Sequence, residues 1–158
     1  MLEWLENTQF STWVRGDLWG WPLVLTIHAL GTALVIGFIF IISLRLLGLF
    51  GLLPYSSLHR LFPVIWVALA IQLLSGFVLW MTKPTQYVAD GAFMLKFALV
   101  VAGGILTLFL YRTIMREAAS WEAKGTISPR GVTFVAATLL VWSSVLVASR
   151  LIAHLGSI

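Results

Sequence analysis

The chain has 158 residues, of which 60% are hydrophobic and 10% are charged, and its formal net charge at pH 7 is +4. Soluble domains are about 45–50% apolar and about 25% charged, so this composition argues against a soluble protein. The absence of cysteine excludes disulfides, iron–sulfur clusters and thiolate metal sites. No surface rich in Lys and Arg with interleaved aromatic residues is evident, and we expect no nucleic-acid partner.

The N-terminal segment is predicted to lie on a membrane surface. Phe10, Trp13, Val14 and Leu18 recur at helical spacing and share one face. A short amphipathic helix of this kind lies in the membrane interface with its apolar face toward the lipid.

Four long apolar segments follow, each with the roughly 20 residues that a helix needs to cross a bilayer. The connections between them are short, which favours up-and-down packing. We therefore predict an all-α polytopic membrane protein, an up-down four-helix transmembrane bundle with a short N-terminal interfacial helix, forming a single domain over residues 1–158. The expected spans are about 21–47, 61–81, 92–111 and 132–155.

The polar connections set the expected ends of the spans. Pro54 and Pro84 prevent the first and second helices from running on. The polar residues after position 111 predict that the third helix continues for a turn or two beyond the membrane. Ser128 and Pro129 fit the start of the fourth helix, with serine as the cap and proline at the first helical position.

The distribution of Lys and Arg predicts the orientation. Most of them lie in the connections after the first and third spans or at the adjoining helix ends: Arg45, Arg60, Arg112, Arg116, Lys124 and Arg130. The positive-inside rule places these connections in the cytoplasm. We expect a multi-pass protein of the bacterial inner (plasma) membrane, in contact with the lipid bilayer, with both termini outside.

Ionisable residues inside a span are costly to bury and are functional hypotheses by default. At about 1.5 Å per residue, His28, Lys96 and Arg150 all lie roughly 8–10 Å in from the outer ends of their helices. His154 lies one turn further out, on the face of Arg150. Lys96 and Arg150 each share a face with small or hydroxyl residues, which predicts that both point into the bundle.

No acidic residue lies within a span, so Lys96 and Arg150 have no deeply buried counter-ion. An anionic ligand would supply one, such as haem propionates, a phosphate headgroup or a quinone oxygen that gains charge on reduction. The alternative is that both long side chains snorkel to the headgroups. Snorkelling also explains Arg45 near the cytoplasmic end of the first span.

His28 admits three interpretations: an interhelical hydrogen-bonding residue, a haem or metal ligand, or a proton carrier. A haem held by both His28 and His154 is disfavoured, because their depths differ by about 8–10 Å at helical rise. Ligation by His28 alone, or by His28 with Met81 or Met94, remains open.

Several short motifs carry a resemblance to known membrane proteins. They are WGWP at 19–22, HALG at 28–31, LRLLG at 44–48, FMLK at 93–96 and SRLI at 149–152. Together they resemble a family of uncharacterised small four-helix bacterial membrane proteins, and the resemblance covers most of the chain.

A more distant resemblance is to HemJ-type protoporphyrinogen oxidases and to the membrane domain of copper-resistance protein D. It is carried by His28 early in the first span, Arg45 near its end and Lys96 opening a later helix. This resemblance implies a helical, haem-associated protein. The histidine expected near the far end of the lysine helix is missing, since residues 110–112 are Leu-Tyr-Arg. An oxidase activity is therefore not implied.

The leading hypothesis is a small integral membrane redox protein with a b-type haem or a quinone in the outer half of the bundle. His28 would be the axial ligand or a hydrogen-bond donor, and Lys96 and Arg150 would hold the anionic end. One alternative is a non-catalytic subunit or scaffold of a larger membrane complex, with a membrane protein partner or as a homo-oligomer. A second alternative is a small transporter. The sequence leaves open whether the protein is an enzyme.

Overall fold

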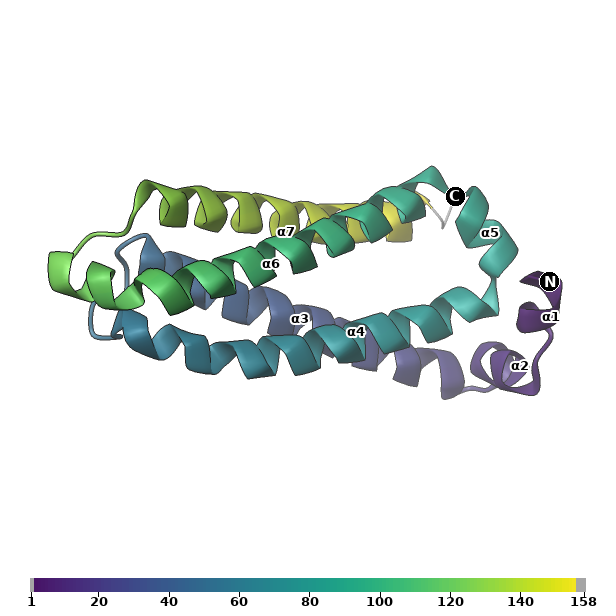
Figure 1. Ribbon diagram of the computed structural model, residues 1–158. Coiled ribbons are helices and arrows are strands. Elements are labelled where there is room, and N and C mark those ends of the chain that lie inside the picture. The colour runs from purple at the N-terminus through teal and green to yellow at the C-terminus, as the bar shows by residue number, and fades with distance from the viewer. Residues whose placement is uncertain (1, 156–158) are drawn as a thin grey trace.

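The computed structural model describes the backbone of residues 2–155 and the side chains of residues 2–150. Along the chain the elements are α1 (Leu2–Glu6), α2 (Gln9–Gly16), α3 (Gly20–Leu46), the 3-10 helix η1 (Tyr55–Leu61), α4 (Phe62–Thr82), α5 (Pro84–Ala89), α6 (Gly91–Lys124) and α7 (Pro129–Leu155) (Figure 1). Within the described part of the chain, four segments are long and apolar enough to cross a membrane: α3, η1 with α4, α6, and α7 as far as Arg150. The prediction of an all-α polytopic membrane fold is confirmed.

The four long helices run up and down along a common axis (Figure 1). The closest packing joins α3 to α4 and α6 to α7, while α3 also contacts α7 and η1 packs against α6. The helices α4 and α6 pack on one another much less. One end of the bundle carries α1, α2 and α5, and the other carries η1 and the α6–α7 connection (Figure 1).

The third long helix extends further than predicted. α6 continues to Lys124 and is capped by Gly125, whose positive φ of 67° closes the helix. The extension beyond position 111 is longer than the predicted turn or two, because one face of this polar segment is still apolar. Ile114, Ala118 and Trp121 are buried on it, and α6 packs against η1.

The predicted start of the fourth helix is confirmed. α7 begins at Pro129, and the Ser128 hydroxyl accepts a hydrogen bond from the Gly131 amide at 3.1 Å. This bond satisfies one of the amides that a helix leaves free in its first turn.

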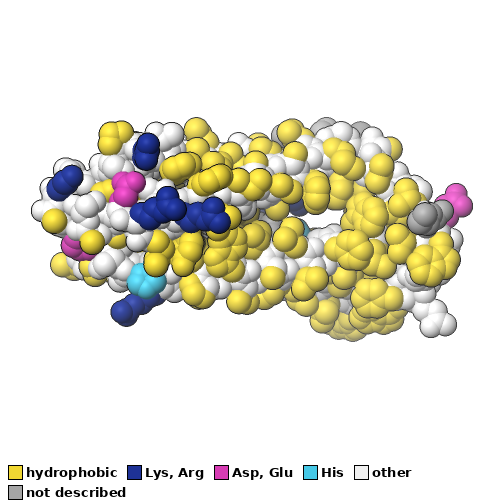
Figure 2. All heavy atoms as spheres, in the orientation of Figure 1, with side chains coloured by type: hydrophobic (Ala, Val, Ile, Leu, Met, Phe, Trp, Pro, Cys, Tyr) yellow, Lys and Arg dark blue, Asp and Glu magenta, His cyan; other side chains and the backbone are white. Residues whose placement is uncertain are grey.

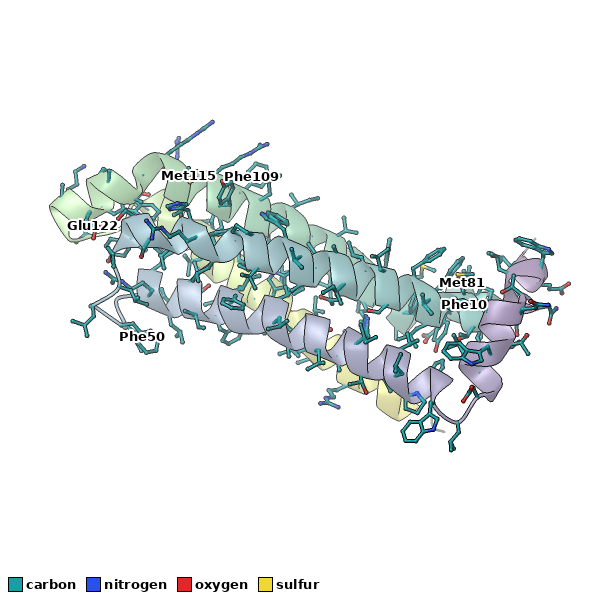
Figure 3. All side chains as sticks on the ribbon, turned by 90° about the horizontal axis from the view of Figure 1, so that it is seen from below. Phe10, Phe50, Met81, Phe109, Met115 and Glu122 are labelled. Carbon is teal, nitrogen blue, oxygen red and sulfur yellow. The ribbon has the colours of Figure 1, made fainter. Side chains whose placement is uncertain are left out.

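The N-terminal segment forms two short helices rather than one. Thr8 caps α2, its hydroxyl accepting from the Ser11 amide at 3.2 Å. Val14 is buried, whereas Phe10 and Trp13 are about half exposed. The Ser11 hydroxyl donates to the Met81 carbonyl at 3.2 Å, so α2 lies across the end of α4 (Figure 3). The helix α5 was not predicted.

The buried core occupies the half of the bundle toward η1. Its largest fully buried side chains include Trp121, Trp142, Phe62, Ile39, Ile42 and Leu58. The outer surface of the long helices is apolar instead of polar, with Leu74, Leu140 and Val67 more than 60% exposed (Figure 2). An exterior of this kind is suited to contact with the lipid bilayer.

Candidate functional site

A cavity of about 630 Å³ lies in the half of the bundle that carries α5. The space-filling view is hollowed there, between α4 and α6 (Figure 2). Most of the lining is apolar, and its aromatic members are Trp21, Phe77, Trp80, Tyr87, Phe93 and Phe97. The polar members are few: His28, Gln72, Lys96 and Ser149. Small-molecule and cofactor sites have this character, with volumes of about 300–1,000 Å³.

The short helix α5 accounts for the separation of α4 and α6 at this end. It bridges the two helices, separated from α4 by the single residue Lys83 and from α6 by the single residue Asp90. Asp90 then caps α6, its carboxylate accepting from the Ala92 amide at 2.9 Å. On the other side α5 rests on α1, where the Thr85 hydroxyl donates to the Glu6 carboxylate at 3.3 Å.

His28, on α3, is half-buried and lines the cavity. Its Nδ1 lies 3.1 Å from the Gln72 carbonyl oxygen and 3.1 Å from the Ser75 hydroxyl. A carbonyl oxygen only accepts, so Nδ1 carries the proton and donates it. Within residues 2–150 no group hydrogen-bonds Nε2. A neutral His28 therefore offers the Nε2 lone pair, which is the atom that binds a metal or accepts a proton.

Glycines let the His28 ring and its helix approach α4 closely. A Cβ added at Gly76 would stand 3.2 Å from His28 Cε1. One turn along α3 from His28, a Cβ at Gly31 would stand 3.1 Å from the Gln72 amide nitrogen and 3.2 Å from the Ala68 carbonyl oxygen. The side chain of any other residue would push the two helices apart or displace the ring.

Gln72 brings an unpartnered acceptor to the site. It is only 2% exposed, yet its Oε1 has no hydrogen-bond partner among the described residues. A buried acceptor left unpaired costs about 1–3 kcal/mol. A donor on a bound molecule would remove this cost.

Lys96, near the start of α6, is half-buried and lines the cavity. Within residues 2–150 the only ion pair joins Arg15 to Glu6 at 3.1 Å, so no described carboxylate compensates Lys96. The cavity therefore contains a cation, an aromatic lining and an oriented histidine.

Arg150 does not join this group. Its side chain is exposed and is absent from the cavity lining, so the predicted orientation into the bundle is wrong. The buried face of α7 instead carries Thr138, Trp142 and Val145. The side chain of His154 lies outside the described residues.

Arg45 lies at the opposite end of the bundle and is 7% exposed. Its guanidinium stacks over the Tyr55 ring, 4.1 Å from the centroid, and its Nε donates to the Leu53 carbonyl. It therefore anchors the α3–η1 loop rather than facing the cavity, and the snorkelling explanation is wrong for this residue.

Sequence reasoning missed several residues of the cavity. Ser75 and Gly76 hold the His28 ring, but serine and glycine in a span predict helix packing as readily as a site. Tyr87 belongs to the unpredicted helix α5. Burial raises the pKa of the Tyr87 phenol, and the nearby Asp90 carboxylate raises it further, so this group is neutral at pH 7. Of the two methionines considered as ligands, Met94 lines the cavity and Met81 does not.

In residues 2–150 no cluster of three or more His, Asp or Glu side chains could hold a metal ion by itself. A haem does not need such a cluster, because its porphyrin supplies four ligands and the protein supplies only the axial ones. Comparisons with protein-family models, curated proteins and solved structures find no match to this chain.

Proposed function

We propose that the protein is a small membrane redox protein that binds a b-type haem in the cavity, with His28 as an axial ligand. The observation that carries this proposal is the pairing of His28 Nδ1 with the Gln72 carbonyl at 3.1 Å, which leaves Nε2 available. Metal-ligating histidines almost always donate their other ring N–H to a carbonyl, a carboxylate or water. When bound, haem iron supplies one-electron redox chemistry.

The remaining lining supports the same ligand. Flat aromatic side chains suit a porphyrin face, and Lys96 suits the charge of a propionate. The Met94 residue also lines the cavity, and its thioether would be available as a second protein ligand to the iron. Arg150 has no part in this version of the site, because it is exposed.

Absorption spectroscopy tests the proposal directly. The purified protein, expressed with supplied haem, is measured air-oxidised and then reduced with dithionite. We expect a Soret band with α and β bands after reduction. His28→Ala should lose these bands, whereas His59→Ala should keep them, because His59 lies in η1 at the other end. A colourless wild-type protein, or an unchanged spectrum in His28→Ala, would overturn haem ligation by His28.

A quinone is the second candidate, and the hollow between α4 and α6 on the lipid-facing surface favours it (Figure 2). A lipid-soluble molecule could enter there without crossing water. The His28 Nε2 lone pair would accept a proton from a quinol, and Lys96 would donate to a quinone oxygen. Extraction and chromatography of bound lipids would reveal a stoichiometric quinone in the colourless case, and its loss in His28→Ala would place it in this cavity.

We also propose the inner-membrane orientation with both termini outside, on the strength of the basic residues at the η1 end. If neither haem nor quinone copurifies, a subunit or scaffold role is the remaining hypothesis. Purification in mild detergent would then show a stoichiometric protein partner.

A further inference from the structure

A second cavity, of about 520 Å³, lies between α6 and α7 near the η1 end of the bundle. Arg112 and Arg116 enter it from α6, one turn apart, and Arg130 enters it from the first turn of α7. We refer to it as the arginine groove. Basic side chains gather at this end of the molecule, which contrasts with the apolar surface of the spans (Figure 2).

The arginine groove has an excess of positive charge. All three arginines are exposed, and none forms an ion pair with a described carboxylate. One carboxylate, that of Glu117, also lines the groove. It accepts a hydrogen bond from the indole of the buried Trp121 at 3.2 Å, so one of its oxygens is already engaged. Three guanidinium groups facing one carboxylate favour an anionic ligand with several oxygen atoms.

The other end of the arginine groove is apolar and lies further along the membrane-spanning parts of α6 and α7. There the Phe109 and Phe134 rings stack with their centroids 5.8 Å apart. Phe109 and Met115 are about half exposed on the surrounding surface. Long nitrogen-tipped side chains project beside these two labelled residues (Figure 3). The groove thus passes from a basic end to an aromatic, lipid-facing end.

We propose that the arginine groove binds an anionic phospholipid. The phosphate lies among Arg112, Arg116 and Arg130, and an acyl chain follows Phe109 and Phe134 toward the bilayer. A free phosphate would contact only the basic end of the groove, whereas a phospholipid contacts both the basic end and the aromatic end. Basic pockets between transmembrane helices bind anionic headgroups by this chemistry.

Native mass spectrometry of the full chain in mild detergent tests the proposal. The probes are dioctanoyl phosphatidylglycerol, dioctanoyl phosphatidylcholine and inorganic phosphate. We expect one phosphatidylglycerol to bind at least fivefold more tightly than phosphatidylcholine. Arg130→Gln should weaken it about fivefold, because one Lys or Arg near an anionic surface contributes about 1 kcal/mol. Arg116→Gln should act similarly.

Arg60→Gln is the matched control, because Arg60 is an exposed arginine at the same end but outside the groove. It should leave phosphatidylglycerol binding unchanged. An equal loss in Arg60→Gln would show diffuse attraction and overturn the site. Equal binding of the two lipids would also overturn it. Displacement of the lipid by millimolar inorganic phosphate, with phosphate binding lost in Arg130→Gln, would identify a free-phosphate site instead of a lipid site.

Discussion

The imidazole of His28 packs against the bare backbone of Gly76, where an added Cβ would stand 3.2 Å from Cε1. Gly76→Leu should therefore displace the ring and place its own side chain in the cavity. Overpacking costs about 1–3 kcal/mol, so we expect at least about a fivefold loss of bound haem or quinone. The measurement is cofactor content per protein after purification.

Gly37→Leu is the control for this substitution. Gly37 also lies in a membrane-spanning helix, α3, but a Cβ added there would meet nothing within 4 Å. It should keep the cofactor and the melting temperature of the wild type. A Gly76→Leu protein with full cofactor content would show that the ligand does not use the His28 side of the cavity.

The burial of the Lys96 ammonium costs free energy that an anionic ligand would offset. The half-buried ammonium has no described carboxylate partner, and a lysine within a span is unfavourable. Lys96→Met should stabilise the cofactor-free protein by about 1–2 kcal/mol. It should also weaken cofactor binding, because the anionic end of the cofactor loses the Lys96 ammonium as its partner. Thermal denaturation with and without cofactor measures both effects, and stabilisation of both forms alike would contradict a role in ligand binding.

Much of the fold could be predicted because lipid imposes a strong constraint on the chain. Every backbone polar group of a span must be satisfied within its helix, so long apolar runs specify transmembrane helices. Hence the first, second and fourth spans and the start of α7 at Pro129 match the structure closely. The length of α6 was missed because most residues of its last turns are polar. The few apolar residues there, including Ile114 and Trp121, are buried because η1 packs against this part of the helix.

The site was predicted only in part. Depth along a helix follows from residue counting, and it correctly brought His28 and Lys96 to one cavity. The direction in which a side chain points depends on which face of its helix packs against the neighbouring helices. For α7 that face carries Thr138 and Trp142, and Arg150 lies outside it. The contact of His28 with the Gln72 carbonyl depends on how closely α3 and α4 approach, which the sequence of α3 alone does not specify.

Arg45 is predicted to be a structural residue. It stacks on Tyr55 and donates to the Leu53 carbonyl while almost fully buried. Arg45→Ala loses a cation–π contact and a charged hydrogen bond, which should cost about 2–4 kcal/mol of stability. Arg45→Lys keeps the charge but not the planar group, and should recover only part of it. Thermal denaturation is the measurement. Full loss of cofactor without a loss of stability would contradict this assignment.

Gly31 is predicted to be essential for the packing of α3 on α4. A Cβ there would stand 3.1 Å from a backbone nitrogen and 3.2 Å from a backbone oxygen, and backbone atoms cannot rotate away. Gly31→Ala should cost about 1–3 kcal/mol by forcing the helices apart. Gly104→Ala is the control, because its nearest neighbour is a Leu69 methyl at 3.8 Å. Equal melting temperatures for the two variants would contradict this close approach.

The orientation in the membrane can be tested cleanly because the chain has no cysteine. Leu52, in the α3–η1 loop, is 100% exposed, and Gln86, in α5 at the other end, is also exposed. If the basic η1 end is cytoplasmic, a membrane-impermeant maleimide should label Gln86→Cys in intact spheroplasts and leave Leu52→Cys unmodified. Leu52→Cys should react only after the membrane is permeabilised. The reverse labelling pattern would place the α5 end, and with it the half of the bundle that holds the His28 cavity, toward the cytoplasm.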